Sequence, residues 1–208
     1  MNKRRWLHKI KPTIITVFIF ESLFLMQCNL FGPEPGDNVY PAQIDLGDSA
    51  AVRAILDSNN LKNISVRRVI GPYSAGRITM LAFDSLGLDS FIFSSDFQKL
   101  DSLWSVNISN NNILKVIVLD SLKYRENYIG LRLERNLLTQ FPISVLKING
   151  LSSVDVSYNK ISTISNDLIN SGFRQIDFDH NKLCSVSDSV KIWLDSVQNN
   201  WANFQDCP

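Results

Sequence analysis

The sequence predicts an α/β solenoid, a short curved horseshoe of five stacked coils whose strands form one parallel sheet. Three observations predict it. One motif, with apolar residues at positions 1, 4, 6, 11 and 14, occurs five times between residues 78 and 186, at spacings of 25, 25, 23 and 22 residues. Apolar residues fill all 25 of those places. An asparagine stands at position 9 in four of the five copies. A period in this range is typical of repeat architectures.

Positions 4 and 6 predict one short strand in each copy. They alternate with polar neighbours, for example Val154 and Val156 around Asp155, which is the pattern of a strand with one buried face. A single copy cannot bury that face alone, so the copies must stack and their strands must pair in parallel.

Position 9 predicts a ladder of buried amides. The chain turns out of the strand there, which leaves backbone groups facing the interior. A carboxamide carries donors and an acceptor, so it can satisfy those groups where an apolar residue cannot. The first copy has Leu86 at this place and is expected to be an atypical terminal coil. The ladder residues are Asn111, Asn136, Asn159 and Asn181.

The motif reads L-x-x-L-x-L-x-x-N-x-L-x-x-L, and its clearest copy begins at Leu151. This pattern resembles the leucine-rich repeat family. The resemblance implies a horseshoe whose concave sheet is a binding surface, with another protein as the ligand.

Residues 1–28 are typical of a secretory leader. Five basic residues flank or precede a mostly apolar run of 13 residues that ends at Met26, too short for a membrane span of roughly 20 residues. The end of the leader resembles a bacterial lipobox in which Cys28 becomes the lipidated N-terminus, although Gln27 departs from the usual small residue. An ordinary signal peptide, an uncleaved anchor and a free thiol are the alternatives. The expected location is the cell envelope, with a lipid anchor in the outer membrane or at the cell surface.

Residues 29–46 are expected to be a linker and residues 47–77 an N-terminal cap. Gly32 to Asp37 has the composition of a tether. In the cap, Asp48 to Leu61 predicts a helix that Asp48 or Ser49 caps and Asn59-Asn60 ends. Ile64 to Ile70 alternates like a strand. Caps are needed because the end of a stacked core would otherwise be exposed.

Residues 78–186 hold the five coils. The segments between their strands are expected to contain short helical or 3₁₀ turns on the convex side. These segments are 93–101, 119–126, 143–148 and 164–170.

Residues 187–208 are expected to form a C-terminal cap. Val190, Trp193, Leu194 and Val197 have the spacing of an amphipathic helix. Trp193 and Trp201 are interpreted as lids over the last coil, with sugar-stacking platforms as the alternative. Cys184 and Cys207 are expected to form a disulfide, because the leader directs the chain to an oxidising compartment. The arrangement resembles the cysteine-bounded caps of secreted leucine-rich repeat proteins.

The charge argues against nucleic acid. Five of the 21 basic and one of the 20 acidic residues lie in the leader, so the rest of the chain carries a net charge of −3. Nucleic-acid binding would need a basic stripe.

The residue types also argue against catalysis. His180 is the one histidine after the leader, and beside it Asp177 and Asp179 are more simply a solvated acidic edge than part of a catalytic triad. Cys184 and Cys207 lack the spacing of a zinc site, and no glycine-rich phosphate loop is present. We expect no enzyme, no metal and no cofactor. Glycosylation tripeptides begin at Asn63 and Asn107, but the lipobox implies a bacterium and they are discounted.

Polar residues beside positions 4 and 6 are expected to line the concave face. Arg, Tyr and Trp are the residue types most often found as interface anchors. A protein partner is expected by resemblance. A glycan, stacked on Trp104 or Tyr158, and a purely structural role are the alternatives. The candidate partner-binding residues are Trp104, Asn107, Arg132, Glu134, Arg135, Asp155, Tyr158, Arg174, Asp177 and Asp179.

Overall fold

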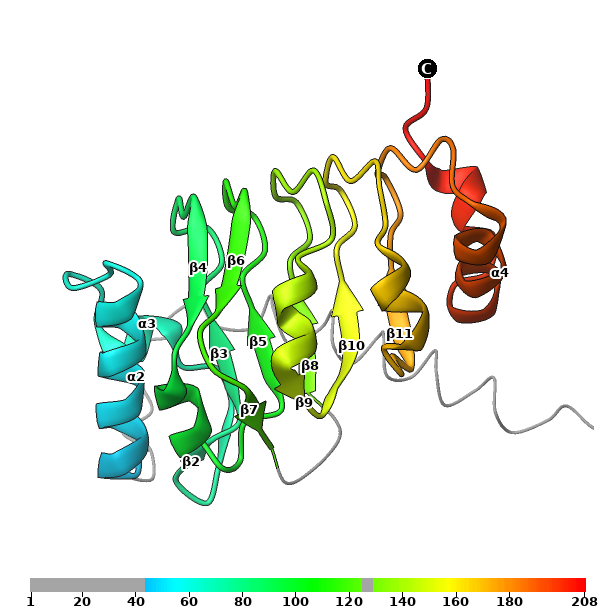
Figure 1. Cartoon of the computed structure of the whole chain (residues 1–208). Coiled ribbons are helices and arrows are strands. Elements are labelled where there is room, and N and C mark those ends of the chain that lie inside the picture. Colours follow the sequence, from blue (N-terminus) through cyan, green and yellow to red (C-terminus); the bar gives the residue numbers. More distant parts are fainter. Residues whose placement is uncertain (1–43, 125–128) are drawn as a thin grey trace, which may run out of the picture. The chain divides into compact units, whose positions relative to one another are not determined.

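The computed structural model describes residues 44–124 and 129–208. The leader, Cys28 and most of the linker lie outside these residues, as does Tyr128 of the third copy. The described chain is mixed α/β, and its main element is a five-stranded parallel sheet (Figure 1). Strand order follows chain order: β3 (Met80–Ala82), β5 (Ser105–Asn107), β8 (Ile129–Arg132), β10 (Leu151–Asp155) and β11 (Gln175–Asp177). Each copy of the motif contributes one strand, and the copies are called repeats 1 to 5 below.

The register of the sheet aligns the repeats as the motif does. The residues at position 4 are paired from strand to strand, and they are Leu81, Val106, Leu131, Val154 and Ile176. The register shifts between Leu151 and Ser153, which inserts Ser152 as a bulge. Every residue at positions 4, 6 and 11 is buried. The predicted strand pattern is therefore confirmed.

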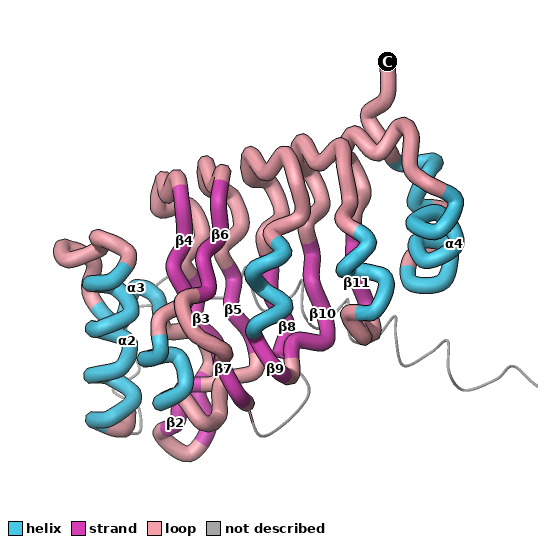
Figure 2. Tube along the Cα trace, viewed as in Figure 1, coloured by secondary structure: helices cyan, strands magenta, loops and turns pink. Residues whose placement is uncertain are grey.

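Shorter strands and 3₁₀ turns lie in the segments that connect the sheet strands (Figure 2). β4 (Ser90–Phe93) pairs in parallel with β6 (Lys115–Val118), and β7 (Leu122–Lys123) pairs with β9 (Ile148–Asn149). The turns are η1 (Ser95–Lys99), η2 (Ile143–Lys147) and η3 (Asn166–Asn170). Short helical turns were predicted in four connections and occur in three. The fourth, 119–126, instead contains β7 in its described part.

Phenylalanines fill the core beneath the first repeats. Phe91 lies 4.9 Å from Phe83 and 5.1 Å from Phe93 between ring centroids, and Phe97 packs on both Phe91 and Phe93. All four rings are buried.

The N-terminal cap begins with the helix α2 (Leu46–Ser58), which lies at one end of the row of strands (Figure 1). Its buried face includes Val52, Ile55 and Leu56. Asn59 ends the helix as predicted, and its side chain bonds both backbone groups of Ile92 on β4, with Oδ1 accepting at 2.7 Å and Nδ2 donating at 3.0 Å. These two bonds join the C-terminal end of α2 to β4.

The residue that caps α2 differs from the prediction. Asp45 accepts the hydrogen bond from the Asp48 backbone N–H at 3.1 Å, so neither Asp48 nor Ser49 is the cap. Asp48 is buried instead. It forms an ion pair with Arg77 at 2.8 Å and accepts the backbone N–H of Ile78 at 2.8 Å. Any of several polar residues near the start of a helix can serve as its N-cap. Here the Asp48 side chain is paired with Arg77, and Asp45 serves as the N-cap.

The predicted strand from Ile64 to Ile70 is wrong. A short helix, α3 (Val66–Val69), stands there, and Ile70 makes one antiparallel bridge to Leu81. Val66, Val69 and Ile70 are spaced i, i+3, i+4, so the same apolar residues also suit a helix. A hairpin of β1 (Tyr73–Ser74) and β2 (Arg77–Ile78) then leads into the sheet.

The C-terminal cap consists of α4 (Asp188–Val197) and η4 (Trp201–Phe204). α4 lies at the other end of the row of strands (Figure 1). Trp193 and Trp201 are buried, which confirms their interpretation as lids. The predicted disulfide between Cys184 and Cys207 is present, with the two Cα atoms 5.6 Å apart.

Candidate functional site

The position 9 asparagines make the ladder that the sequence predicts. Asn159 is typical. Its Oδ1 accepts the N–H of Leu138 in the previous repeat at 2.9 Å, and its Nδ2 donates to Leu133 O of that repeat and Val156 O of its own, both at 2.9 Å. Asn111, Asn136 and Asn181 bond in the same way. All four are buried, so the ladder holds neighbouring repeats together.

Position 5 on the sheet face supplies a second, local kind of bond. In three repeats its side-chain oxygen accepts the backbone N–H two residues later. The pairs are Asn107 with Ser109 at 2.9 Å, Asp155 with Ser157 at 2.9 Å and Asp177 with Asp179 at 2.8 Å. Asn and Asp commonly form such turns. These side chains therefore fix the end of the strand.

Asn107 is the one predicted partner-binding residue that is buried. Only 7% of it is exposed, and its Oδ1 is engaged with Ser109. In repeat 2 the nearby residues Ser105 and Ser109 are also buried. Asn107 therefore fixes the end of its strand and offers little exposed surface to a partner.

An acidic strip runs across the sheet at Glu134, Asp155, Asp177 and Asp179. Asp155 and Asp177 are direct partners on neighbouring strands. Burial, followed by the hydrogen bond and the charge of Asp155, raises the pKa of Glu134 to about 7. Burial raises the pKa of Asp177 to about 6 and that of Asp179 in the same direction. Glu134, Asp177 and Asp179 therefore retain protons at a pH where free carboxyl groups are ionised.

Gln198, which ends α4, closes this strip on the side of the C-terminal cap. Its Nε2 donates to Asp179 Oδ1 at 2.7 Å and to Asp177 Oδ1 at 3.3 Å. Its Oε1 accepts the N–H of Phe178 at 2.8 Å. One amide thus serves both the acidic strip and the backbone of the last repeat.

An ordered stack of side chains borders the sheet at position 8. The Cζ atom of Arg135 lies 4.4 Å from the centroid of the Tyr158 ring, and that ring stacks on His180 at 4.2 Å and 19°. Arg135, Tyr158 and His180 are called the edge stack below. They come from successive repeats, so Arg135 and His180 cover opposite faces of Tyr158. The His180 Nδ1 lies 3.3 Å from Asp206 Oδ1 of the C-terminal tail.

Position 8 has the same unusual backbone in every repeat. Its φ angle lies between 53° and 57° at Ser85, Asn110, Arg135, Tyr158 and His180. This left-handed conformation is uncommon for residues other than glycine and costs about 1 kcal/mol or more for each. The turn aims the side chains of the edge stack along one border of the sheet.

The other predicted residues lie on or near the same face. Trp104 is 37% exposed and Tyr158 is 44% exposed. Arg132 stands at position 5 of repeat 3, between Asn107 and Asp155 in the strand register. Arg174 lines a shallow hollow of about 260 Å³ with Gly150, Leu151, Ser152 and Gly172. The structure therefore brings together the central and C-terminal candidates and leaves Trp104 beside them in repeat 2.

Two functional side chains were not predicted from the sequence. Gln205 accepts the N–H of Leu183 and donates to Phe178 O, the bonds that a ladder asparagine makes to the previous repeat. It stands 24 residues after Asn181, within the repeat spacing, so the period could have located it. The repeat period does not locate Gln198, because the position of this residue is set by the end of the helix α4.

The described residues offer no group of three or more metal-ligating side chains that could hold an ion. Within 44–124 and 129–208, no helix is long and apolar enough to cross a membrane. The proposed lipidation residue Cys28 lies outside these ranges. No protein-family model and no curated protein matches this chain.

Proposed function

We propose that this protein is a non-catalytic binding module of the leucine-rich repeat type, secreted and displayed at the cell envelope. In this proposal the five repeats are coils of a solenoid, and the partner is another protein. Cys28 would carry the lipid that anchors the chain. The parallel sheet in repeat order and the asparagine ladder support the architecture.

The observation that carries the proposal is the edge stack, which borders the sheet in repeats 3 to 5. Arg135, Tyr158 and His180 are pre-ordered by contact with each other, so binding would cost little side-chain entropy. Arg and Tyr are among the commonest residues at the centre of protein interfaces. The acidic strip adjoins this stack and supplies charge of the opposite sign to Arg132 and Arg135. A partner with both charges would find a complement on one surface.

A glycan ligand is less well supported, because stacking on a sugar needs a free aromatic face. Both faces of Tyr158 are covered by Arg135 and His180. Trp104 is the remaining exposed aromatic among the candidates. A glycan ligand and a purely structural role are therefore kept as outcomes of the test.

The test compares two charge reversals on the purified protein without its leader. Arg132→Glu changes the sheet face, and Lys123→Glu changes the exposed end of β7. We expect Arg132→Glu to weaken binding to an envelope protein by at least about tenfold and Lys123→Glu to leave it unchanged. Circular dichroism would check that both variants keep the wild-type fold. Equal loss in both variants would place the partner elsewhere, and binding only to a polysaccharide panel would favour the glycan.

Anchoring is tested separately in a bacterium that processes lipoproteins. The wild type should partition into detergent and the Cys28→Ser variant into the aqueous phase. If the intact mass shows that the mature protein starts at a residue other than Cys28, the lipidation proposal is refuted. The binding proposal is independent of that result.

A further inference from the structure

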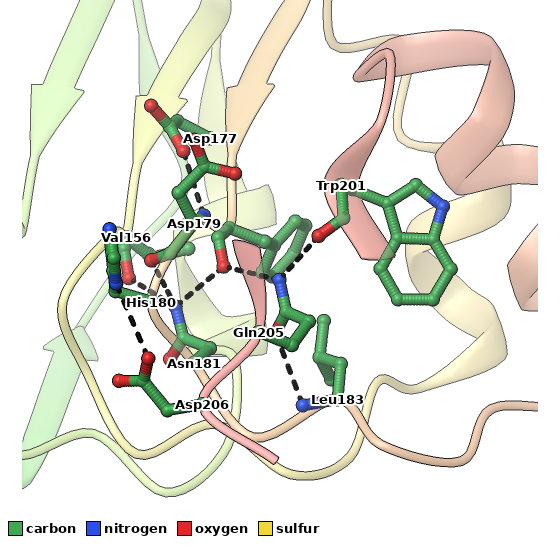
Figure 3. Close-up of polar contacts among 10 residues, drawn as sticks. Val156, Asp177, Asp179, His180, Asn181, Leu183, Trp201, Gln205 and Asp206 are labelled. Carbon is green, nitrogen blue, oxygen red and sulfur yellow. Dashed lines mark hydrogen bonds and ion pairs between the residues drawn. The ribbon is translucent and has the colours of Figure 1, made fainter. Parts of the chain in front are cut away.

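The C-terminal tail occupies the place of a sixth repeat. In the interior of the sheet, the position 8 N–H of one repeat donates to a carbonyl of the next, as Tyr158 does to Asp179 O at 2.9 Å. At the end of the sheet His180 donates instead to Phe204 O, 2.6 Å away. Gln205 forms the two bonds that a ladder asparagine forms to the previous repeat. The Asp206 N–H donates to Asn181 O at 2.7 Å. Figure 3 shows the bonds of Gln205 to Leu183 and Trp201 and the contact of His180 with Asp206.

The last residues are held in that place by very little apolar contact. Trp201 is 4% exposed, and its Nε1 donates to Asp195, so the chain is anchored up to that residue. Among residues 202–208, all of them described, no side chain is buried, and that of Gln205 is partly exposed. Hydrophobic burial therefore stabilises the cap up to Trp201 and contributes little beyond it.

The disulfide is the one covalent tie of this segment. It joins Cys207 to Cys184, just after the buried Leu183. Both cysteines are exposed, so a soluble reductant can reach the bond.

We propose that the Cys184–Cys207 disulfide is a redox latch on the end of the sheet. With the latch closed, residues 202–208 complete the last repeat. With the latch open, they leave while α4 and Trp201 stay in place. Release uncovers the N–H groups of His180 and Leu183 and removes Asp206 from the His180 ring. The edge stack then loses its terminal support, and this consequence for binding rests on the proposed function.

The chemistry is a two-electron thiol–disulfide exchange with a dithiol as co-reactant. One thiolate of the dithiol attacks a sulfur of the disulfide, the S–S bond breaks, and the other cysteine leaves as a thiolate that takes a proton. The second thiol of the reductant then attacks the reductant's own sulfur in the mixed disulfide, which closes the reductant's disulfide and releases the first cysteine as a thiolate that also takes a proton. Cys184 and Cys207 end as thiols, and the dithiol ends as a disulfide.

Hydrogen exchange of the ligand-free protein tests the latch, before and after treatment with a dithiol at neutral pH without denaturant. We expect the amides of His180 and Leu183 to exchange at least about tenfold faster after reduction. The amides of Val156 and Tyr158, which bond to β11 and its following residues, should not change. Trp201 fluorescence should also stay the same. The Cys207→Ser variant should reproduce the reduced pattern without a reductant.

Two results would overturn the proposal. Unchanged protection at His180 and Leu183, with both thiols verified by mass, would show that hydrogen bonds alone hold the tail. Loss of protection throughout α4, together with a change in Trp201 fluorescence, would show that the disulfide supports the whole cap. Neither result depends on a binding partner, so failure of the latch is distinguishable from failure of the proposed function.

Discussion

The two ends of the sheet are closed by different means. At the N-terminal end, α2 packs Val52, Ile55 and Leu56 against the core, and a buried carboxylate, Asp48, is paired with Arg77. At the C-terminal end, the side chains of Gln198 and Gln205 replace the bonds of a missing repeat, and a disulfide secures the tail. Buried apolar side chains of α2 close the N-terminal end. Polar contacts and one disulfide close the last part of the C-terminal end. The two ends should therefore respond differently to mutation.

The largest effect is expected at the N-terminal end. Asp48→Ala removes the partner of Arg77 and leaves the N–H of Ile78 unpaired. Leaving the buried N–H of Ile78 without its acceptor costs about 1–3 kcal/mol. The loss of the charged bonds from the partly exposed Arg77 should bring the effect to about 3 kcal/mol, which urea unfolding would measure. The control is Asp57→Ala in the same helix, because Asp57 forms an exposed pair with Arg53 worth less than about 1 kcal/mol. Equal loss in both variants would mean that the buried pair does not hold this end.

The interior of the sheet should lose nearly as much when one ladder amide is removed. Asn159→Ala leaves buried backbone groups of two repeats without partners, at about 1–3 kcal/mol. Asn159→Asp should also destabilise, because it removes the donors and buries a charge. Thermal melts would compare both variants with Asn112→Ala at an exposed position. Wild-type melting of the two Asn159 variants would contradict a structural ladder.

A smaller loss is expected at Gln205. Its bonds to Leu183 and Phe178 match those of a ladder asparagine, but its side chain is only partly buried. Gln205→Ala should therefore cost about 1 kcal/mol in urea unfolding of the oxidised protein. Asn203→Ala, on the exposed surface of the same tail, serves as the control. If Gln205→Ala cost as much as Asn159→Ala, the contrast between interior and end would disappear.

A dependence on pH is also expected at Glu134, where solvent around the partly exposed side chain reduces the effect. Its pKa is about 7 in the folded protein against an ordinary value of 4.5, so the folded state binds the proton more tightly. Stability is then lost as the pH rises from about 4.5 to about 7. Glu134→Gln removes this loss, and its melting temperature should fall less than that of the wild type over this range. Parallel curves for Glu134→Gln and the wild type would refute the effect.

The sequence was most informative where a contact recurs in every repeat. Positions 4, 6 and 11 each appear five times, so one accidental match cannot mislead the alignment, and the sheet has the expected register. The ladder follows from the same period. Trp193, Trp201 and the disulfide were predicted because large aromatic residues and paired cysteines have few alternative roles where a secretory leader is expected.

The errors concern residues that occur once or whose role is local. The segment at Val66 fits two periodicities, and contact with the sheet selects the helix. Asn107 is polar and alternates with apolar residues, yet its amide turns back to Ser109, a choice that depends on backbone geometry. The stacking of Arg135 on Tyr158 also depends on three-dimensional neighbours, because the two residues lie 23 positions apart in the chain. The sequence therefore predicted which residues lie on the sheet face but not which of their side chains are exposed.

Closure at both ends also sets a size for what can lie across the sheet. Five parallel strands enclose four gaps of about 4.8 Å, so the outer strands are roughly 19 Å apart. An extended peptide crosses that distance with about six residues, and an α-helix with about 13. Because each end is already bonded to its own cap, neighbouring molecules cannot lengthen this face by adding strands while the caps are in place. A ligand longer than this must continue over the caps, and their surfaces would then take part in its recognition.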